Sequence, residues 1–410
     1  MLKVIKYGRR AYAAMDAMNY LNTEAGAGVS GIIADVEKNG DAAVKKYTLK
    51  FDGVALKSLK VPEEKIKKAW GSVDARLFKP LLRAAKNIEK YNVMQMKNIR
   101  GFVYKNKGYT ITHKYIPVDS AALYIPGGQA PLFSTVLMAA IPARVAGVRR
   151  IAVISPPRFN GDVNPYILVA ADMLGINEIY RIGGAQAVAA LSIGTKTIKK
   201  VDKIVGPGNI YSTMAKKEVF GKIGIESING PSEVTIVADD TANPEFVKYD
   251  LLAQAEHING HALLITNSEK FLSVMKVKLK GIKYDITAVL VKNIDEALQL
   301  VNYKAPEHLT VAVKDTGAFI SRVRNCPAIF EGNYTPVAFG DYMAGSNHIL
   351  PTNGTARFFS GLSVLDFLKH THVVKASREA MDAFGPDAET LAEIETLSNH
   401  KKSIMARREL

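Results

Sequence analysis

The sequence contains a single cysteine, Cys326, among 410 residues. One thiol can form neither an internal disulfide nor a cysteine-rich zinc cage, so a bound metal would be held by His, Asp, Glu or Gln. We expect Cys326 to be a small core side chain. The sequence also lacks an apolar run of the roughly 18 residues that a membrane span needs, and a secretion signal at its start. These absences predict a protein that begins near Met1 and works in the cytoplasm.

An excess of acidic side chains is absent as well. The chain has 54 Lys and Arg against 39 Asp and Glu, a net charge of +15 at pH 7. Such a charge can indicate a nucleic-acid surface. The basic residues are scattered in short groups, among them Lys45-Lys46, Lys67-Lys68, Lys199-Lys200, Lys216-Lys217 and Lys401-Lys402. This scatter favours a solvated surface, or a field that attracts anionic cofactors, over a nucleic-acid partner.

Helical periodicity dominates residues 10–100, and short β-rich runs then alternate with helical patterns. The first set of predicted strands is 121–125, 151–154, 178–182 and 203–205, with helices expected at 136–146, 165–174 and 186–192. The second set is 233–237, 262–266, 288–291 and 309–313. Strands that alternate with helices are typical of parallel sheets with crossover helices. The sequence therefore predicts the α/β class with two parallel sheets.

The letters of the dinucleotide fingerprint GxGxxG occur at residues 26–31. Only the helix-like string DAMNYLNTEA precedes them. The fingerprint works where the end of a strand meets the start of a helix. We therefore expect a loop before a helix here, and no cofactor site.

Three other glycine clusters do follow predicted strands. They are Tyr124-Ile125-Pro126-Gly127-Gly128, Ile182-Gly183-Gly184-Ala185-Gln186 and Gly206-Pro207-Gly208-Asn209. Ligands bind at this carboxyl edge of open α/β sheets, where glycine permits close backbone approach and helix amino termini favour phosphate. Tight turns would explain each cluster alone. Three at one edge, with Tyr124, Gln186 and Asn209 among them, favour a cofactor site.

Candidate metal ligands lie in the string DLLAQAEH, where helical periodicity places Gln254 and His257 on one face as i and i+3. An imidazole nitrogen and a carboxamide oxygen can hold a metal ion. Asp341, in a glycine-rich loop, is a candidate third ligand, and His400 lies near the carboxyl end. Taken singly, each has a plainer explanation: a capping pair, a turn-stabilising aspartate and a surface histidine.

Glu307 and His308 precede the apolar string LTVAV. A carboxylate and an imidazole at the start of a strand can serve as a base and its partner, although the dipeptide alone says little. Ser232 and Glu233 begin another predicted strand. They would either contact a substrate or make a turn.

Together these strings resemble the histidinol dehydrogenase family over nearly the full length of the chain. The matching strings, in the order of the family, are LYIPGGQAPLFSTVLMAAIPARVAGV, IGGAQAVAALSIGT, VDKIVGPGN, GPSEV, DLLAQAEH, APEHL and GDYMAGSNHILPT. The carboxyl-terminal string EIETLSNHKKSI fits less closely, but keeps a Glu and a His five residues apart.

The resemblance implies an NAD-dependent dehydrogenase that oxidises L-histidinol to L-histidine through histidinal with two NAD, in histidine biosynthesis. The implied ligands of one Zn²⁺ per subunit are Gln254, His257, Asp341 and His400. The implied catalytic pair is Glu307 and His308. The implied substrate contacts are these six residues together with Ser232, His348 and Glu395. The implied NAD contacts are Tyr124, Gln186 and Asn209. Manganese would also suit such mixed nitrogen and oxygen ligands.

The resemblance further implies two Rossmann-like domains of incomplete dinucleotide-fold type, with small helical extensions at both ends. The implied bounds are 1–20 for an amino-terminal helical extension, 21–123 plus 233–362 for a larger domain, 124–232 for an NAD-binding domain and 363–410 for a helical tail. The family is a homodimer that exchanges this tail, so His400 and Glu395 would complete the neighbouring subunit's site. Positions i and i+5 lie about 140° apart on a helix, so these two residues share a face only if the helix breaks.

The implied chemistry follows from the residue types. Zinc would orient the substrate nitrogen and polarise its oxygen. His308, with an imidazole that titrates near neutral pH, suits the proton transfers, and Glu307 would activate water to attack the aldehyde. No cysteine lies near these motifs in the sequence for a thioester route, so a hydrated aldehyde is the expected intermediate. Two alternatives stay open: a related zinc and NAD dehydrogenase that acts on another small alcohol, and a nucleic-acid-binding protein suggested by charge alone.

Overall fold

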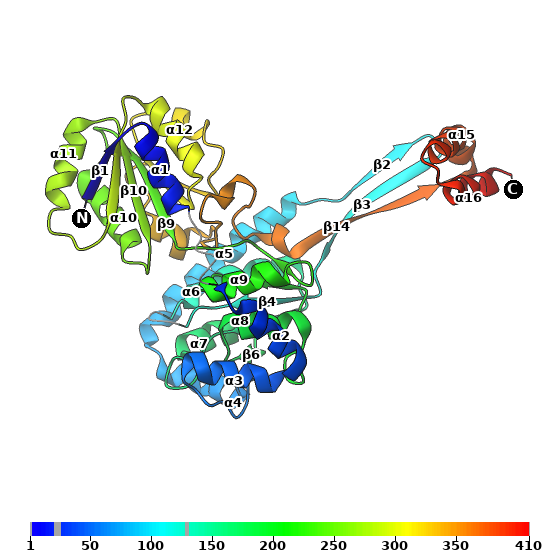
Figure 1. The fold of residues 1–410 in the computed structure, drawn as a ribbon, viewed down its shortest axis with the longest axis horizontal. Coiled ribbons are helices and arrows are strands. Elements are labelled where there is room, and N and C mark those ends of the chain that lie inside the picture. The colour runs from blue at the N-terminus through cyan, green and yellow to red at the C-terminus, as the bar shows by residue number, and fades with distance from the viewer. Residues whose placement is uncertain (1, 20–25, 128–130, 410) are drawn as a thin grey trace. The chain divides into compact units, whose positions relative to one another are not determined.

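The computed structural model of the chain describes residues 2–19, 26–127 and 131–409 (Figure 1). It separates into two compact units, which are described in turn. The first comprises Met1–Val93 and Asp119–Phe367, and the second comprises Met94–Val118 and Leu368–Leu410. Gly128, of the first predicted glycine cluster, lies outside the described residues, as do residues 20–25 around the first predicted domain boundary.

The first parallel sheet of unit 1 has six strands in the order β1-β11-β10-β9-β12-β13. Their bounds are Leu2–Lys6 for β1, Glu233–Ala238 for β9, His261–Thr266 for β10, Ile286–Leu290 for β11, His308–Ala312 for β12 and Ala328–Glu331 for β13. The central strands are apolar along their length, as expected of a sheet covered on both faces. β9 and β12 pair in register near the middle of the sheet, with Val234 opposite His308.

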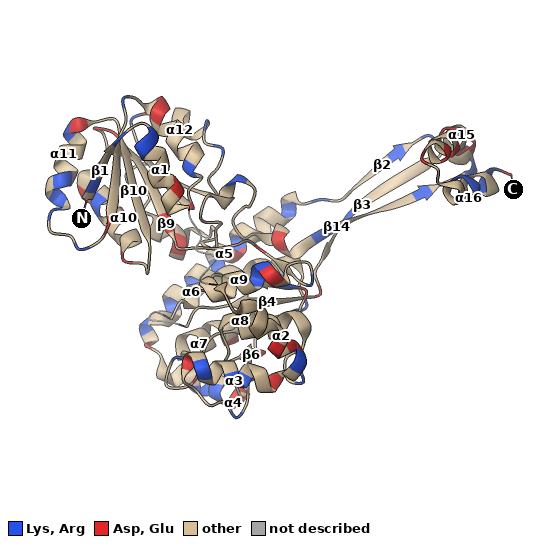
Figure 2. Ribbon diagram, in the orientation of Figure 1, with Lys and Arg blue, Asp and Glu red and all other residues tan. Residues whose placement is uncertain are grey.

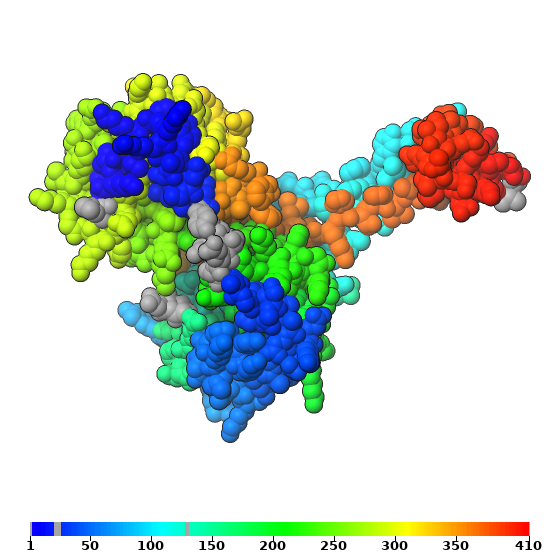
Figure 3. Space-filling view, viewed as in Figure 1, coloured from blue at the N-terminus to red at the C-terminus, as the bar shows by residue number. Residues whose placement is uncertain are grey.

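Helices cover both faces of this sheet. They are α1 (Arg9–Met18) and α12 (Ile294–Lys304) on one face, and α10 (Pro244–Ala255) and α11 (Glu269–Lys278) on the other. Successive strand residues point to opposite faces. Val234 and Ile236 therefore pack with α10, whereas Val237 packs with α12. In Figure 3 the blue amino-terminal segment lies against the yellow-green residues of this layer.

The second parallel sheet of unit 1 has five strands in the order β6-β5-β4-β7-β8. Their bounds are Ser120–Tyr124 for β4, Arg150–Ile154 for β5, Ile179–Tyr180 for β6, Lys203–Val205 for β7 and Gly224–Ile225 for β8. The crossover helices are α6 (Phe133–Ala146), α7 (Pro165–Met173), α8 (Gly184–Ile193) and α9 (Ile210–Val219). The predicted α/β class with two parallel sheets is thus confirmed.

After α1, the α-helices described in the first hundred residues are α2 (Val29–Asn39), α3 (Asp41–Asp52), α4 (Glu63–Ala69) and α5 (Phe78–Asn98). Residues 26–28 form a turn, and α2 begins at Val29 with Gly28 in the left-handed region at φ +91°. The first three of the GxGxxG residues therefore form a turn before a helix, as expected, and the last three begin α2. Short helices Thr316–Ile320 (α13) and Val337–Phe339 (α14) complete the larger layer.

The packing divides the chain differently from the predicted domain bounds. Residues 2–6 form the edge strand β1 of the six-stranded sheet rather than part of a helical extension. Val29, Val36 and Leu59 share a core with Ala122 and Ile154 of the five-stranded sheet, although residues 21–123 were expected to join 233–362. Helical periodicity identifies an apolar face, but many sheets can bury such a face, so the pattern does not say which.

Unit 2 contains a three-stranded antiparallel sheet in the order β14-β3-β2. Its strands are Phe102–Asn106 (β2), Tyr109–Pro117 (β3) and Leu368–Ala376 (β14), and its helices are α15 (Arg378–Ile394) and α16 (Ser398–Arg408). The tail 363–410 was expected to be helical, but its first part pairs with β3. The string HTHVVK, with β-branched residues in alternation, suits a strand.

Charged residues are distributed over many elements. Figure 2 shows Lys and Arg interspersed with Asp and Glu on the outer helices of unit 1. Several opposite charges pair there, for example Lys46 with Asp35 at 2.8 Å. Among the described residues, no helix is both long and apolar enough to cross a bilayer.

Candidate active site

Glu307 and His308 lie where β12 enters the centre of the six-stranded sheet. The preceding helix α12 ends at Lys304, and Ala305 takes a left-handed conformation at φ +50°. This turn directs the chain into the strand beside β9. Both side chains are buried, and His308 lies on the α10 side of the sheet, as Val234 does.

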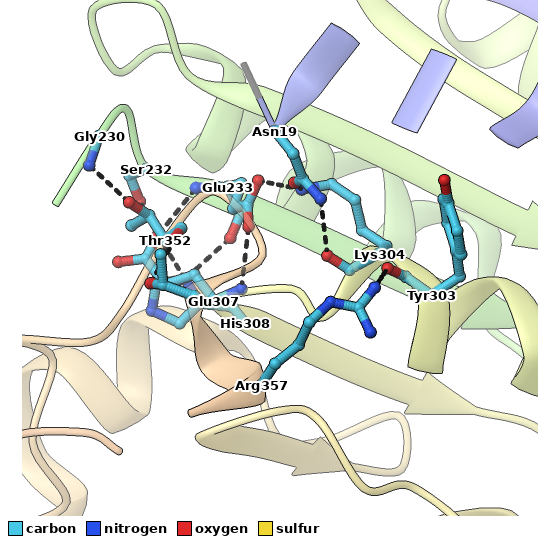
Figure 4. Close-up of polar contacts among 11 residues, drawn as sticks. Asn19, Gly230, Ser232, Glu233, Tyr303, Lys304, Glu307, His308, Thr352 and Arg357 are labelled. Atoms are coloured by element: carbon cyan, nitrogen blue, oxygen red, sulfur yellow. Dashed lines mark hydrogen bonds and ion pairs between the residues drawn. The ribbon is translucent and has the colours of Figure 1, made fainter. Parts of the chain in front are cut away.

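The carboxylate of Glu307 is held by residues at the start of β9 (Figure 4). Its Oε2 accepts a hydrogen bond from Ser232 Oγ at 2.7 Å and another from the backbone N–H of Glu233 at 2.8 Å. The same oxygen lies 3.4 Å from His308 Nδ1. Within the described parts of the chain, no hydrogen bond reaches Oε1, so this oxygen is available to a ligand or water.

The imidazole of His308 has two different surroundings. Its Nδ1 lies 3.0 Å from the carbonyl oxygen of Glu233, which fixes a proton on that nitrogen. Its Nε2 is buried, has no hydrogen-bond partner in the described chain, and lies 3.8 Å from Asp341 Oδ1. Burial lowers the pKa of His308, but the negative charges of Glu307 and Asp341 outweigh it and raise this pKa to about 9.

Asp341 lies in a single turn of π-helix, Gly340–Ala344. Such turns are rare and often occur at functional sites. A side chain at Gly340 would meet the Phe330 ring at 2.5 Å, so only glycine fits there. Burial raises the pKa of the Asp341 carboxyl, whereas the charges of His308, His348 and His257 lower it.

His348 joins Asp341 to the five-stranded layer. Its Nδ1 lies 3.1 Å from the backbone oxygen of Asp341, and its Nε2 lies 3.2 Å from Thr135 Oγ1 on α6. Burial lowers the pKa of His348, which favours the neutral imidazole. The two parallel sheets of unit 1 are thus linked by polar side chains at this site.

The predicted metal ligands of unit 1 lie at the end of α10 and in the π-turn. Gln254 is buried, and its Nε2 lacks a hydrogen-bond partner among the described residues. His257 is exposed, directly after the helix, and is near enough to Asp341 to influence its pKa. A carboxylate oxygen, a carboxamide oxygen and an imidazole nitrogen form a donor set that suits a divalent zinc or manganese ion.

These three residues do not form a complete site by themselves. In the described ranges, no three side chains of the types His, Cys, Asp and Glu gather closely enough to hold an ion. A metal site here needs the Gln254 carboxamide as a ligand and a further donor from elsewhere.

The residues predicted to bind NAD gather at the carboxyl edge of the five-stranded sheet. Tyr124 ends β4, and its hydroxyl accepts a hydrogen bond from the backbone N–H of Gly184 at 2.9 Å. Both amide atoms of Gln186 are buried and have no partner in the part of the chain that the structure describes. The side chain of Asn209 accepts from the N–H of Ser212 at 3.0 Å and so caps α9. The capping explains Asn209 structurally, whereas the unpaired amide of Gln186 points to a ligand.

Close packing explains two glycines of the third cluster. A Cβ at Gly206 would lie 2.2 Å from the backbone oxygen of Tyr124, and one at Gly208 would lie 2.0 Å from Ser212 Oγ. A buried ion pair also holds Gly206: Lys216 Nζ donates to its oxygen at 3.0 Å, and Glu226 Oε1 accepts from its N–H at 2.9 Å. The backbone of this loop is therefore held on both sides of Gly206.

Cys326 is distant from the predicted catalytic pair in the sequence but close to it in the folded chain, which corrects the expectation that no thiol is near. Its Sγ lies 4.0 Å from the backbone oxygen of Glu307 and donates to Ala328 O at 3.2 Å. Burial raises the pKa of this thiol to about 12. A thiol that stays protonated is a poor nucleophile, so the cysteine has a structural role.

A family model described as histidinol dehydrogenase matches residues 17–408. The histidinol dehydrogenase of Geobacillus kaustophilus is 44% identical over 396 residues and covers 93% of both chains. That of Methanocaldococcus jannaschii is 41% identical over 392 residues, covering 92% of this chain and 91% of the relative. The crystal structure of histidinol dehydrogenase from Elizabethkingia anophelis matches with a TM-score of 0.91 at 34% identity, over 100% of this chain and 98% of that one.

The chain belongs to the histidinol dehydrogenase family. It is therefore an oxidoreductase, as the sequence predicted. The unit 1 residues taken from that family resemblance fall into three groups. Ser232, Glu307, His308, Asp341 and His348 are joined by direct contacts, and Tyr124, Gln186 and Asn209 share the other sheet edge. Gln254 and His257 lie at the end of α10.

The two remaining residues assigned from the histidinol dehydrogenase resemblance belong to unit 2. Glu395 directly follows α15, and His400 lies in the first turns of α16. The helix breaks between them at Thr396, which has φ +62°. Both side chains are exposed. Their contribution to the site of a second subunit stays a prediction.

Two residues of the site escaped the sequence analysis. Thr135 contacts His348, but its string FSTVLM is typical of any buried helix. Lys304 pairs with Glu233 behind the catalytic residues, whereas a lysine at the end of a helix usually points to solvent. Neither carried a signal in its local pattern.

Proposed function

We propose that this chain oxidises L-histidinol to L-histidine through histidinal, with two NAD and one divalent ion per subunit, in the last steps of histidine biosynthesis in the cytoplasm. The observation that carries the proposal is the contact of Glu307 and His308 at 3.4 Å beside Asp341. A carboxylate with one oxygen available and an imidazole with one unpaired nitrogen suit two successive oxidations that also consume water.

The metal ligands would be Gln254, His257 and Asp341, together with His400 from the tail of a second subunit. The burial of the Gln254 carboxamide and the nearness of His257 to Asp341, whose pKa it lowers, support this set. When bound, the ion orients the substrate nitrogen and polarises its oxygen, and NAD accepts hydride.

His308 moves the protons. The Glu233 carbonyl keeps one proton on Nδ1, so when the ring is neutral its Nε2 carries a lone pair. A cation held by Asp341 would offset the charge of that carboxylate, which would lower the pKa of His308 from about 9 and favour the neutral ring. This nitrogen takes the proton of the substrate hydroxyl in the first oxidation and a proton of the hydrated aldehyde in the second. Ser232, His348 and Glu395 help to hold the substrate around it.

Glu307 activates water. Its Oε2 is fixed by Ser232 and by the backbone of Glu233, which leaves Oε1 to take a proton from the water that adds to histidinal. The hydrated aldehyde, rather than a thioester, is the intermediate, because the nearby thiol stays protonated.

The experiment that tests this function is the stoichiometry of NADH formed per histidinol consumed, with and without a chelator. We expect two NADH per histidinol, and loss of turnover after the metal is removed. Formation of one NADH would contradict the second oxidation. Faster oxidation of another small alcohol than of histidinol would instead support a related dehydrogenase.

A further inference from the structure

A fully buried ion pair lies behind the catalytic residues, formed by Glu233 and Lys304 (Figure 4). Each side chain is 1% exposed. Removing two charges from water costs about as much as their attraction returns, so such a pair is weak evidence of stabilisation. Its position behind Glu307 and His308 suggests a role other than stabilisation of the fold.

Glu233 contacts both catalytic residues through three separate groups. Its Oε1 accepts a hydrogen bond from the backbone N–H of Glu307 at 3.2 Å. Its backbone N–H donates to Glu307 Oε2 at 2.8 Å, and its backbone oxygen lies 3.0 Å from His308 Nδ1. The two glutamates thus hold each other reciprocally, side chain to backbone in both directions.

Lys304 fixes the other end of the turn that leads to Glu307. Its Nζ donates to Asn19 Oδ1 at 2.5 Å as well as to Glu233, and Asn19 Nδ2 donates to the backbone oxygen of Lys304 at 3.1 Å. The guanidinium of Arg357 donates to the backbone oxygen of Tyr303, one residue earlier. The turn is therefore anchored at Lys304 by two side chains, at Tyr303 by one, and at the backbone N–H of Glu307 by one.

The pair lies on the opposite face of the sheet from the imidazole. His308 is in register with Val234 and shares its α10 face. Glu233 and Val237 are an even number of positions apart on β9, so their side chains point to the same face of the sheet. Val237 packs with α12 on that face, and Lys304 is the last residue of α12. The pair therefore acts on the catalytic residues from behind the sheet.

We propose that the Glu233 side chain, held in place by Lys304, is a positioning group for Glu307 and His308: its oxygen accepts from the Glu307 N–H and so sets the orientation of the carboxylate and the imidazole before substrate binds. This inference rests on the proposed function and deepens it. Misplacement of a catalytic group by a fraction of a bond length lowers turnover much more than binding. Loss of this accepting oxygen should therefore reduce kcat while KM for histidinol stays nearly constant.

The test compares two double variants that both remove the buried charges. Glu233→Gln with Lys304→Met keeps an oxygen that can accept from the Glu307 N–H, whereas Glu233→Met with Lys304→Met does not. We expect the first to keep kcat within about threefold of the wild type, and the second to lose at least about tenfold, with KM for histidinol changed by less than about threefold. Thermal unfolding of both variants separates positioning from loss of stability.

A matched control is Glu178→Gln, which removes a carboxylate paired with Arg150 at 2.7 Å on the other sheet. It should leave kcat unchanged. If the variant with Glu233→Met does not fold, Asn19→Ala serves instead. This substitution removes two hydrogen bonds to Lys304 and keeps the ion pair, and we expect kcat to fall by about threefold.

Equal kcat for the two double variants at equal Tm would overturn the proposal, and so would an Asn19→Ala variant with wild-type kcat. A loss that appears in KM rather than kcat would also overturn it. Failure of the wild type to reduce NAD with histidinol would refute the proposed function instead, so the two failures are distinguishable.

Discussion

Glu307 presents its two carboxylate oxygens to different surroundings. Oε2 is occupied by Ser232 and by the backbone of Glu233, at 2.7 and 2.8 Å, and Oε1 is left to a ligand. The same negative charge raises the pKa of the neighbouring His308 to about 9. A raised pKa means that protonation of His308 stabilises the fold. This contribution is complete below the usual histidine pKa and is lost as the pH rises through about 9.

A second perturbed residue, Asp250, lies on α10, one turn before Gln254. Burial alone raises the pKa of Asp250 to about 6, from 3.8. The folded state therefore disfavours its charge, and the penalty grows as the pH rises from the unfolded to the folded pKa. We expect Asp250→Asn to stabilise the protein by about 1–2 kcal/mol at pH 8, after allowance for partial exposure, and by less at pH 5.

Denaturant unfolding at the two pH values measures this effect. The control is Asp295→Asn, which removes an exposed carboxylate paired with Arg322 and should change stability little at either pH. Equal gains for Asp250→Asn at both pH values would contradict the assignment.

At the scale of elements, each parallel sheet of unit 1 has a buried Lys–Glu pair beside a loop at the end of a strand. Glu233 and Lys304 hold the entry to β12, and Lys216 and Glu226 hold the Gly206 peptide between β7 and α9. The second pair is 3% exposed on each side. The loop that follows β7 is thus as firmly fixed as the turn before β12.

We expect the double variant Lys216→Met with Glu226→Gln to weaken NAD binding, because it frees the Gly206 oxygen while it keeps an acceptor for the Gly206 N–H. KM for NAD should rise at least about fivefold, with a smaller change in kcat. Initial rates at varied NAD measure it. Lys217→Met, the exposed neighbour on α9, is the matched control. A KM for NAD equal to that of this control would count against an NAD site at this edge.

The strings that precede and follow strands indicated candidate residues for the site. Glycine clusters and polar residues at strand ends pointed to Tyr124, Gln186, Glu307 and His308, because the carboxyl and amino ends of parallel strands are defined by topology; the roles of these residues stay predictions. The contact of Lys304 with Glu233 was not predictable, because it forms only through the pairing of β9 with β12. Likewise, the apolar face of α2 does not specify which sheet it covers.

At the scale of the whole molecule, the ligands assigned to the metal belong to both units. Gln254, His257 and Asp341 are in unit 1, whereas His400 is in unit 2. Tail exchange in a dimer would combine ligands from two chains. The helix break at Thr396 separates Glu395 from His400, so the 140° offset that a continuous helix would impose on the two side chains does not apply.

Subunit mixing tests this sharing. Asp341→Asn and His400→Ala should each be inactive as homodimers. When the two are unfolded together and refolded, half of the dimers carry one intact site, so about one quarter of the wild-type activity should return. If mass spectrometry detects mixed dimers and no activity returns, each site is built from a single chain.

The measurement that tests the account most directly is NADH formed per histidinol by Glu307→Gln beside the wild type and His308→Ala. We expect two NADH for the wild type, about one for Glu307→Gln with histidinal accumulating, and no turnover for His308→Ala. Formation of two NADH per histidinol by Glu307→Gln, or equal loss of both oxidations in that variant, would contradict the separate roles of the carboxylate and the imidazole.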